Sequence, residues 1–239
     1  MVGIGPGNIN QMTPQARTAI SESDVIVGYT VYIDLIHDLC DGKIVKSTAM
    51  RQEVDRCRIA LNYALDDKCV AFVCSGDAGV YGMAGIITEV ACDYPEVEII
   101  TIPGITACLS GAAILGAPLI HDFAVISLSD LLTPFEMIEK RIKLAAEADF
   151  VICLYNPKSK KRKNHLDKAV EFIHQIRPWN TPCGYVKNIG RDGEHGTICE
   201  LADLLENDDI DMFTTVFIGK SNTKVINGKL VTPRGYNIK

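Results

Sequence analysis

Short apolar runs alternate with longer amphipathic segments along the first half of the chain. Three runs are continuously apolar, as expected for strands of a parallel sheet that is covered on both faces. They are VIVG at 25–28, CVAFVC at 69–74 and VEIITI at 97–102. Residues 51–66 follow a helical period, with Arg and Asp residues away from one apolar side. That side carries Val54, Cys57, Leu61 and Leu65. Thr13 and Pro14 predict another helix start, because a hydroxyl caps a helix and proline suits its first position.

The same alternation continues from about residue 120 and predicts a second unit of this kind. Its expected strands are FAVISL at 123–128, DFVICLY at 149–155, CGYVKN at 183–188 and TTVFIGK at 214–220. The segment TPFE at 133–136 has the pattern of a capping box, so we expect a helix from there to about Ala148. The C-terminal KVINGKLVTPRGY predicts a hairpin that turns at Asn227-Gly228.

Two residues that break regular structure, Gly116 and Pro118, interrupt the pattern within LGAPLIHD at 115–122. We therefore expect an α/β fold of two domains, 1–117 and 118–239, with a ligand-binding cleft between them. A length of 239 residues suits this division.

Composition and charge narrow the class of protein. With 47% apolar and 23% charged residues, the chain has the composition of a soluble globular protein. It has no apolar run of about 18 residues and no signal-peptide pattern, so we expect no membrane span and a cytoplasmic location. A net charge of −6 argues against nucleic acid as the partner. The nine cysteines form no CxxC pair, so we expect buried reduced thiols, with a scattered metal or iron–sulfur site as the alternative.

Three glycine-containing segments follow predicted strands or the chain start. GIGPG at 3–7 is not a dinucleotide fingerprint, because Asn8 stands where the third glycine is needed and no ribose-binding acid follows VIVGYT. SGDAGVYG at 75–82 and PGITA at 103–107 follow strands whose carboxyl ends are the usual ligand sites of α/β sheets. These segments either let backbone approach a small ligand or are ordinary turns, with Asp77 and Thr106 acting only as helix caps.

Two further features belong to the second half. The segment LYNP at 154–157 is followed by five cations within six residues, which attract a polyanionic ligand or form a solvated loop. They are Lys158, Lys160, Lys161, Arg162 and Lys163. His121 and Asp122 lie at the expected domain junction, where the histidine is either structural or functional.

These segments, in this order and spacing, resemble the tetrapyrrole methylase superfamily. Its signatures are a proline-containing glycine loop at the N-terminus, a GDPxxYG-type loop and a PGxTA segment. Ala78 stands where many members carry proline, a departure that is familiar in the C17-methylating subfamily. Resemblance to that subfamily covers essentially the whole chain. It is carried by VGYTVY (27–32), GDAGVYGMAG (76–85), HDFAVISLSDLLTP (121–134), IEKRI (138–142), ADFVICLYNPKS (148–159) and TPRGY (232–236).

The resemblance implies a homodimer in which each chain binds S-adenosylmethionine between its two α/β domains and releases S-adenosylhomocysteine. Carried over position by position, the implied cofactor-binding residues are Pro6, Ser75, Gly76, Asp77, Val80, Thr106, Ala107, Tyr155, Asn188 and Ile189. The implied reaction is C17 methylation of cobalt-factor III, cobalt-precorrin-3 or precorrin-3B with ring contraction, in cobalamin biosynthesis. Cobalt would arrive with the substrate, so we expect no metal held by the protein.

The implied chemistry needs aligned reactants more than a nucleophilic side chain. Ring contraction needs proton transfer, for which Asp77 and His121 are the candidate catalytic residues. Cations would bind the acetate and propionate groups of the substrate. The candidates are Lys158, Lys160, Arg162, Arg51 and Arg234. The alternatives are another tetrapyrrole methylase of the same fold, a nicotinamide-dependent oxidoreductase that uses the GIGPG loop, and a non-catalytic tetrapyrrole carrier.

Overall fold

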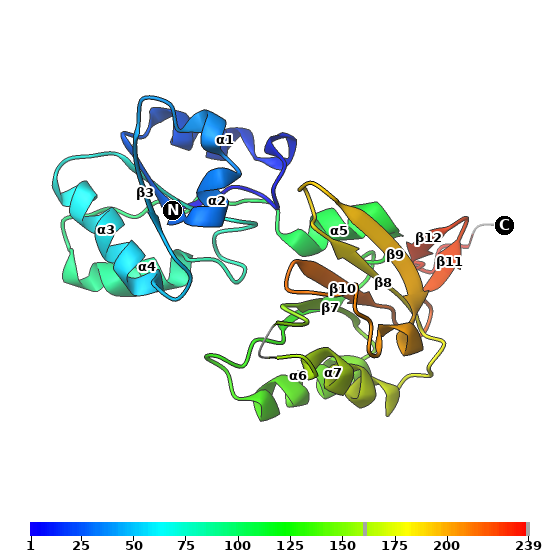
Figure 1. Cartoon of the computed structure of the whole chain (residues 1–239). Helices are drawn as coiled ribbons and strands as arrows, with labels where there is room; N and C mark the ends of the chain where they lie inside the picture. Colours follow the sequence, from blue (N-terminus) through cyan, green and yellow to red (C-terminus); the bar gives the residue numbers. More distant parts are fainter. Residues whose placement is uncertain (160–161, 238–239) are drawn as a thin grey trace. The chain divides into compact units, whose positions relative to one another are not determined.

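A computed structural model describes residues 1–159 and 162–237, and the chain divides into two compact units, Met1–Ala107 and Cys108–Lys239. The first unit, coloured from blue to green in Figure 1, contains a four-stranded parallel sheet in the order β1-β4-β2-β3. Its strands are β1 (Val2–Gly3), β2 (Val25–Tyr29), β3 (Ile44–Thr48) and β4 (Val70–Cys74). Its helices are α1 (Pro14–Glu22), α2 (Thr30–Asp34), α3 (Glu53–Leu65) and α4 (Ala84–Val90), with 3₁₀ turns η1 (Ile9–Gln11), η2 (His37–Leu39) and η3 (Ala91–Asp93).

The strands β2 and β4 confirm the predictions at 25–28 and 69–74. Val25 and Val27 pack into one apolar cluster, whereas Ile26 packs into the other. Successive side chains of a strand point to opposite faces, so a continuous apolar run supplies both clusters.

The predicted strand at 97–102 is wrong for most of its length. Only Ile102 forms a bridge, to Val2, and its N–H donates to the carbonyl of Met1 at 2.8 Å. The neighbouring strand β1 has two residues, so it offers few backbone groups for pairing.

The helix α3 confirms the helix predicted at 51–66, but its buried side coincides only in part with the predicted apolar side. Val54 and Leu65 are 40% and 47% exposed, whereas Cys57 and Leu61 are buried as predicted. Arg56 is buried as well, with 4% of its surface exposed. The helical period alone assigns a charged residue to the solvent side.

The second unit contains a five-stranded sheet in the order β6-β7-β10-β8-β9. Its strands are β6 (Phe123–Ser127), β7 (Val151–Tyr155), β8 (Pro182–Lys187), β9 (His195–Glu200) and β10 (Thr214–Ile218). The helices that follow residue 120 are α6 (Phe135–Glu147) and α7 (His165–His174), together with the 3₁₀ turn η4 (Leu201–Leu204). All four predicted strands are present, but only β6 and β7 are parallel, so this unit does not repeat the first. The edge strand β9 was not predicted.

The helix termini and the final hairpin test local predictions. Thr13 caps α1, because its Oγ1 accepts the N–H of Ala16 at 3.1 Å. The predicted capping box at 133–136 does not form, because Pro134 occupies the N-cap position of α6 and makes no side-chain cap. The hairpin of β11 (Lys224–Ile226) and β12 (Lys229–Val231) turns at Asn227-Gly228 as predicted, with φ values of 49° and 72°.

The boundary between the units falls after residue 107 rather than after residue 117. The helix α5 (Ala107–Leu115) is the reason, because its Gly111 lies against Ile189 and Phe217 of the second unit. The following strand β5 (Gly116–Ala117) pairs with β12 in a third small sheet. These elements therefore pack with the residues that come after them.

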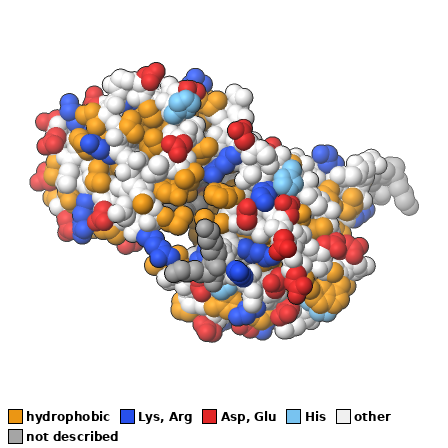
Figure 2. All heavy atoms as spheres, viewed as in Figure 1, with side chains coloured by type: hydrophobic (Ala, Val, Ile, Leu, Met, Phe, Trp, Pro, Cys, Tyr) orange, Lys and Arg blue, Asp and Glu red, His pale blue; other side chains and the backbone are white. Residues whose placement is uncertain are grey.

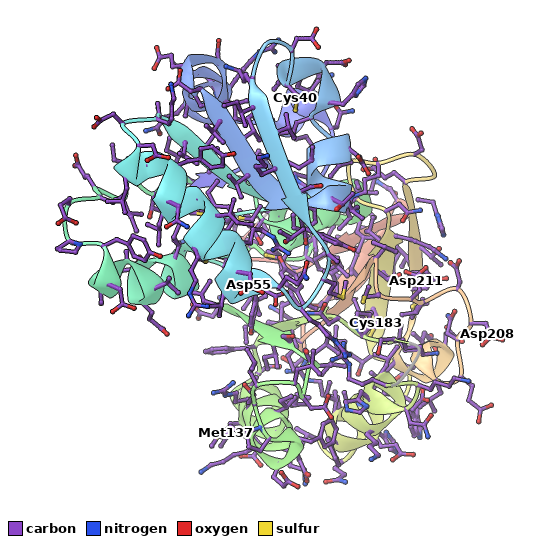
Figure 3. All side chains as sticks on the ribbon, turned by 60° about the vertical axis from the view of Figure 1, so that its left-hand side comes forward. Cys40, Asp55, Met137, Cys183, Asp208 and Asp211 are labelled. Atoms are coloured by element: carbon purple, nitrogen blue, oxygen red, sulfur yellow. The ribbon has the colours of Figure 1, made fainter. Side chains whose placement is uncertain are left out.

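Cysteines and charges are distributed over both units. All nine cysteines are unpaired and five are buried; Figure 3 labels Cys40 in the first unit and Cys183 in the sheet of the second. The described residues contain no group of three or more His, Cys, Asp or Glu side chains that could hold a metal ion. Charges of both signs are interspersed over the face that Figure 2 shows. In the part of the chain that the structure describes, no helix has the length and apolarity to span a bilayer.

Candidate functional site

Three glycines bring the conspicuous loops of the first unit together. Gly5 and Gly76 exchange backbone hydrogen bonds, with N···O distances of 3.1 and 2.7 Å. A Cβ atom on Gly104 would collide with the carbonyl oxygen of Gly76 and would lie 2.7 Å from the backbone of Gly3. Only glycine fits such an approach. The segments 3–7, 75–82 and 103–107 therefore meet beyond the carboxyl ends of β1 and β4, as an α/β ligand site requires.

The carboxylate of Asp77 joins two of these loops. Its Oδ1 accepts the N–H groups of Gly79 and Val80 at 2.8 and 3.0 Å. Its Oδ2 accepts the N–H of Gly104 at 3.0 Å. It does not cap α4, whose N-cap residue is Met83. These bonds give Asp77 a role in holding the loops, and a proton-transfer role remains a prediction from sequence.

The same loops contain most of the predicted cofactor residues of this unit. Pro6 follows Gly5, and Ser75 precedes Gly76. Thr106 is buried, and its Cα is the nearest atom, at 3.7 Å, that a Cβ on Gly76 would meet. Val80 is 38% exposed. The geometry thus brings these positions onto adjoining loops.

In the second unit, Tyr155 lies at the end of β7 beside the start of α5. Its hydroxyl accepts the N–H of Cys108 at 2.7 Å, next to the predicted position Ala107. A hydrogen bond with Cys153 lowers the pKa of the Cys108 thiol to about 7, and the Tyr155 hydroxyl adds to this effect against the opposing effect of burial. The contact ties Tyr155 to the first turn of α5.

Asn188 and Ile189 form the turn that follows β8. Asn188 has a φ of 52°, and its N–H donates to the carbonyl of Phe213 at 3.1 Å. Ile189 is 5% exposed and lies against Gly111 of α5. Both predicted positions therefore belong to an ordered turn of the second unit.

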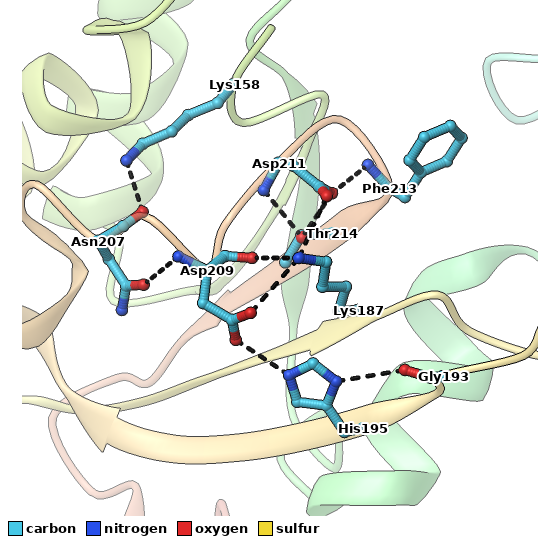
Figure 4. Close-up of polar contacts among 9 residues, drawn as sticks. All are labelled: Lys158, Lys187, Gly193, His195, Asn207, Asp209, Asp211, Phe213 and Thr214. Atoms are coloured by element: carbon cyan, nitrogen blue, oxygen red, sulfur yellow. Dashed lines mark hydrogen bonds and ion pairs between the residues drawn. The ribbon is translucent and has the colours of Figure 1, made fainter.

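An ionic network that the sequence analysis missed supports this turn (Figure 4). The Nζ of Lys187 lies 3.4 Å from Asp209 Oδ1 and 3.2 Å from Asp211 Oδ2. The Nε2 of His195 lies 2.9 Å from Asp209 Oδ2. The hydrogen bond to Asp211 raises the pKa of Lys187, and the hydrogen bond to Asp209 raises the pKa of His195. The only signal in the sequence was the acidic run at 208–211.

The family follows from comparison with known proteins. Residues 1–205 match the family described as Tetrapyrrole (Corrin/Porphyrin) Methylases. The chain belongs to this family.

This tetrapyrrole methylase is 44% identical to the probable cobalt-factor III C(17)-methyltransferase of Salmonella typhimurium strain LT2, over 100% of the chain and 99% of the relative. It is 46% identical to the cobalt-factor III methyltransferase of Priestia megaterium, but it spans only 45% of that longer protein. The crystal structure of the methyltransferase CobJ superimposes with a TM-score of 0.91 at 36% identity, and the match covers 97% of this chain and 98% of CobJ.

Within the tetrapyrrole methylase, His121 is not near Tyr155. The register of β6 against β7 pairs Ser127 with Tyr155, whereas His121 precedes Phe123 at the other end of β6. At a rise of about 3.3 Å per residue, roughly 15 Å of strand separates the two ends. The catalytic role of His121 stays a prediction from sequence.

Two cations of the basic segment 158–163 of the tetrapyrrole methylase are bound by other residues of the second unit. Lys158 donates to the carbonyl of Asn207 at 2.7 Å. Arg162 donates to Ser129 Oγ at 2.8 Å and lies 3.8 Å from Asp130. Lys160 and Lys161 lie outside the described residues, whereas Arg51 and Arg234 are exposed in different units. These contacts fix two of the predicted substrate-binding cations in place.

Proposed function

We propose that this protein methylates C17 of cobalt-factor III with S-adenosylmethionine as the methyl donor and contracts the macrocycle, as a step of cobalamin biosynthesis. The observation that carries the proposal is the 44% identity to the Salmonella relative over nearly the full length of both chains. The two relatives described above are named for cobalt-factor III, which favours this cobalt-containing substrate over cobalt-precorrin-3 and metal-free precorrin-3B. Cobalt is part of the substrate in this proposal.

The loops of the first unit fit S-adenosylmethionine as the cofactor. At Gly76 the φ of 70° and the missing side chain leave backbone that a ligand can approach closely. We propose that the cofactor contacts Pro6, Ser75, Gly76, Asp77, Val80, Thr106 and Ala107 of the first unit and Tyr155, Asn188 and Ile189 of the second. When bound, it supplies a methyl group that its sulfonium already activates.

The residues of the chain then have to bind and orient the two reactants. Alignment of this kind accounts for a large part of many enzymatic rate enhancements, and it needs rigid loops. The glycine contacts and the Asp77 carboxylate provide that rigidity here. Asp77 is also the proton-transfer candidate that lies on the proposed cofactor loops.

A nicotinamide-dependent oxidoreductase is the alternative from another class. In dinucleotide sites, the glycine loop leads directly into a helix whose N-terminus holds the pyrophosphate. Here α1 begins only at Pro14, well after Gly7, and the intervening residues form the 3₁₀ turn η1. The methylase proposal needs no such helix and is therefore favoured.

Calorimetric titration with S-adenosylhomocysteine and, separately, with NAD tests the cofactor. We expect binding of S-adenosylhomocysteine at micromolar concentrations and none of NAD. Incubation with S-adenosylmethionine and cobalt-factor III should then add one methyl group to the macrocycle, as measured by mass spectrometry. Binding of NAD alone, or transfer to another tetrapyrrole but not to cobalt-factor III, would contradict the proposal. We also propose a cytoplasmic homodimer, and light scattering on the purified protein tests the dimer.

A further inference from the structure

Arg56 of α3 is a buried cation that has no acidic partner among the described residues. Its side chain lies under the surface of the first unit, where its Nε donates to Thr48 Oγ1 at 2.7 Å and its Nη2 to the carbonyl of Ala49 at 2.8 Å. The Tyr29 ring lies 5.7 Å from the guanidinium carbon. Among the described residues, no carboxylate oxygen comes within 4.0 Å of its nitrogens. Burial of a charge is unfavourable unless the charge is paired or fully hydrogen-bonded.

The other buried arginine among the described residues, Arg177, has more acceptors around its two Nη groups, although its Nε has no hydrogen-bond partner. Arg177 donates to four backbone carbonyl oxygens, three of which lie at or just beyond the C-terminal end of α6. That helix end carries partial negative charge. Arg56 has two polar acceptors for five N–H groups, and the described residues offer its Nη1 no hydrogen-bond acceptor. An anion that accepts hydrogen bonds from Nη1 would supply the missing acceptor and neutralise the charge.

The side chain of Arg56 reaches the carboxyl ends of the strands, which is the side of the sheet where the glycine loops lie. Tyr29 and Thr48 are paired in register at the carboxyl ends of β2 and β3. On its other side, β2 pairs with β4, which leads into the loop 75–82. With neighbouring strands about 4.8 Å apart, the end of β3 is roughly 10 Å from the end of β4. Arg56 is therefore at the same edge as the glycine loops but to one side of them.

Acidic side chains near Arg56 in the sequence are turned to other partners. Glu53 accepts the N–H of Arg51 at 3.1 Å. Asp55, which Figure 3 labels on α3, is exposed and lies 3.7 Å from Arg58. These two carboxylates therefore do not pair with Arg56, and an external anion can do so.

We propose that Arg56 binds a peripheral carboxylate, an acetate or propionate group, of the tetrapyrrole substrate. The inference rests on the proposed function, because only that reaction brings a polycarboxylate macrocycle to this edge. The carboxylate of the cofactor is the other source of the same chemistry, but the distance of Arg56 from the glycine loops favours the substrate. Arginine suits this task because its guanidinium stays charged, and its Nη1 can donate charge-assisted hydrogen bonds to a carboxylate.

Substitution of Arg56→Gln, with Arg58→Gln as the matched control, tests the proposal. Arg58 lies on the same helix, carries the same charge and is exposed. The affinity for cobalt-factor III is measured by absorbance titration and that for S-adenosylhomocysteine by calorimetry. We expect Arg56→Gln to raise the Kd for cobalt-factor III about 10- to 100-fold, the loss that a charge-assisted hydrogen-bonded pair predicts. The Kd for S-adenosylhomocysteine should stay within about twofold, and Arg58→Gln should change neither.

Each other outcome has a defined meaning. Unchanged affinity of Arg56→Gln for cobalt-factor III would overturn the inference, and so would a loss of S-adenosylhomocysteine affinity alone, which would assign the carboxylate to the cofactor. Failure of the wild-type protein to bind cobalt-factor III would instead refute the proposed function. If Arg56→Gln does not fold, hydrogen exchange of the wild-type segment 48–56 decides. Protection by cobalt-factor III but not by S-adenosylhomocysteine is expected, and no protection by cobalt-factor III overturns the inference.

Discussion

Asp77 has two possible roles that one substitution separates. As a structural residue it holds the loops 75–82 and 103–107 together through three backbone N–H groups. As a proton-transfer residue it would act on the substrate. Asp77→Asn preserves the size of the side chain but replaces one carboxylate oxygen with an NH₂ group.

The structure predicts the size of the effect. The amide oxygen that Asp77→Asn retains still accepts the N–H groups of Gly79 and Val80, whereas the new NH₂ group faces the N–H of Gly104. One hydrogen bond to a charged group is lost, which corresponds to about 1.5–3 kcal/mol of unfolding free energy. At about 2–4 °C per kcal/mol for a chain of this length, the protein should melt about 3–12 °C lower.

The assay compares Asp77→Asn with Asp93→Asn, an exposed carboxylate of η3 in the same unit. Scanning calorimetry gives the melting temperature, and titration gives the affinity for S-adenosylhomocysteine. Methyl transfer at saturating concentrations of both substrates gives kcat. We expect Asp77→Asn to melt earlier and bind S-adenosylhomocysteine about tenfold more weakly, as about 1.4 kcal/mol of loop support predicts. Its kcat should stay within about tenfold of wild type, and Asp93→Asn should match wild type throughout.

The opposite pattern would refute this reasoning. Loss of a general acid or base typically lowers turnover by about 10²–10⁴-fold. If Asp77→Asn melts and binds S-adenosylhomocysteine like the wild type while kcat falls by that amount, Asp77 transfers protons and its loop contacts are secondary.

Three further substitutions test other parts of the structure. Gly104→Ala should lower the unfolding free energy by about 1–3 kcal/mol, because its methyl group would collide with the Gly76 carbonyl; unchanged denaturant unfolding would contradict that contact. His195→Ala should cost about 0.2–1 kcal/mol near pH 5.5 and less near pH 8.5. The raised pKa of His195 means that its pairing stabilises the protein below about pH 6.5 and that this stabilisation is lost as the pH rises through the raised pKa. The lowered pKa of Asp209 keeps its carboxylate ionised at both pH values, so equal losses in urea titrations at the two pH values would refute this reasoning. Tyr155→Phe removes the hydroxyl that accepts the N–H of Cys108 at the start of α5, so it should lower the unfolding free energy by about 0.5–1.5 kcal/mol and weaken S-adenosylhomocysteine binding. Stability and binding equal to those of the wild type would contradict the importance of this contact.

The sequence was informative wherever a local pattern has one structural solution. Continuous apolar runs at 25–28 and 69–74 favoured buried strands, and both formed, and Asn227-Gly228 suits few turns besides a tight hairpin. The sequence also placed two glycine segments after predicted strands, whose carboxyl ends are the usual ligand sites of α/β sheets. The structure brings these segments and the N-terminal glycine loop together, whereas their role in binding stays a prediction.

The tertiary structure alone decided features that depend on partners distant in sequence. An apolar run does not encode the direction of its neighbour, so the antiparallel pairing of β7, β10, β8 and β9 could not be predicted. The ionic network of Lys187 joins β8 to a later loop through groups that have no sequence periodicity. Arg56 is the clearest case. Helical periodicity assigns its charge to solvent, but the end of β3 supplies the hydroxyl and carbonyl that keep the guanidinium under the surface.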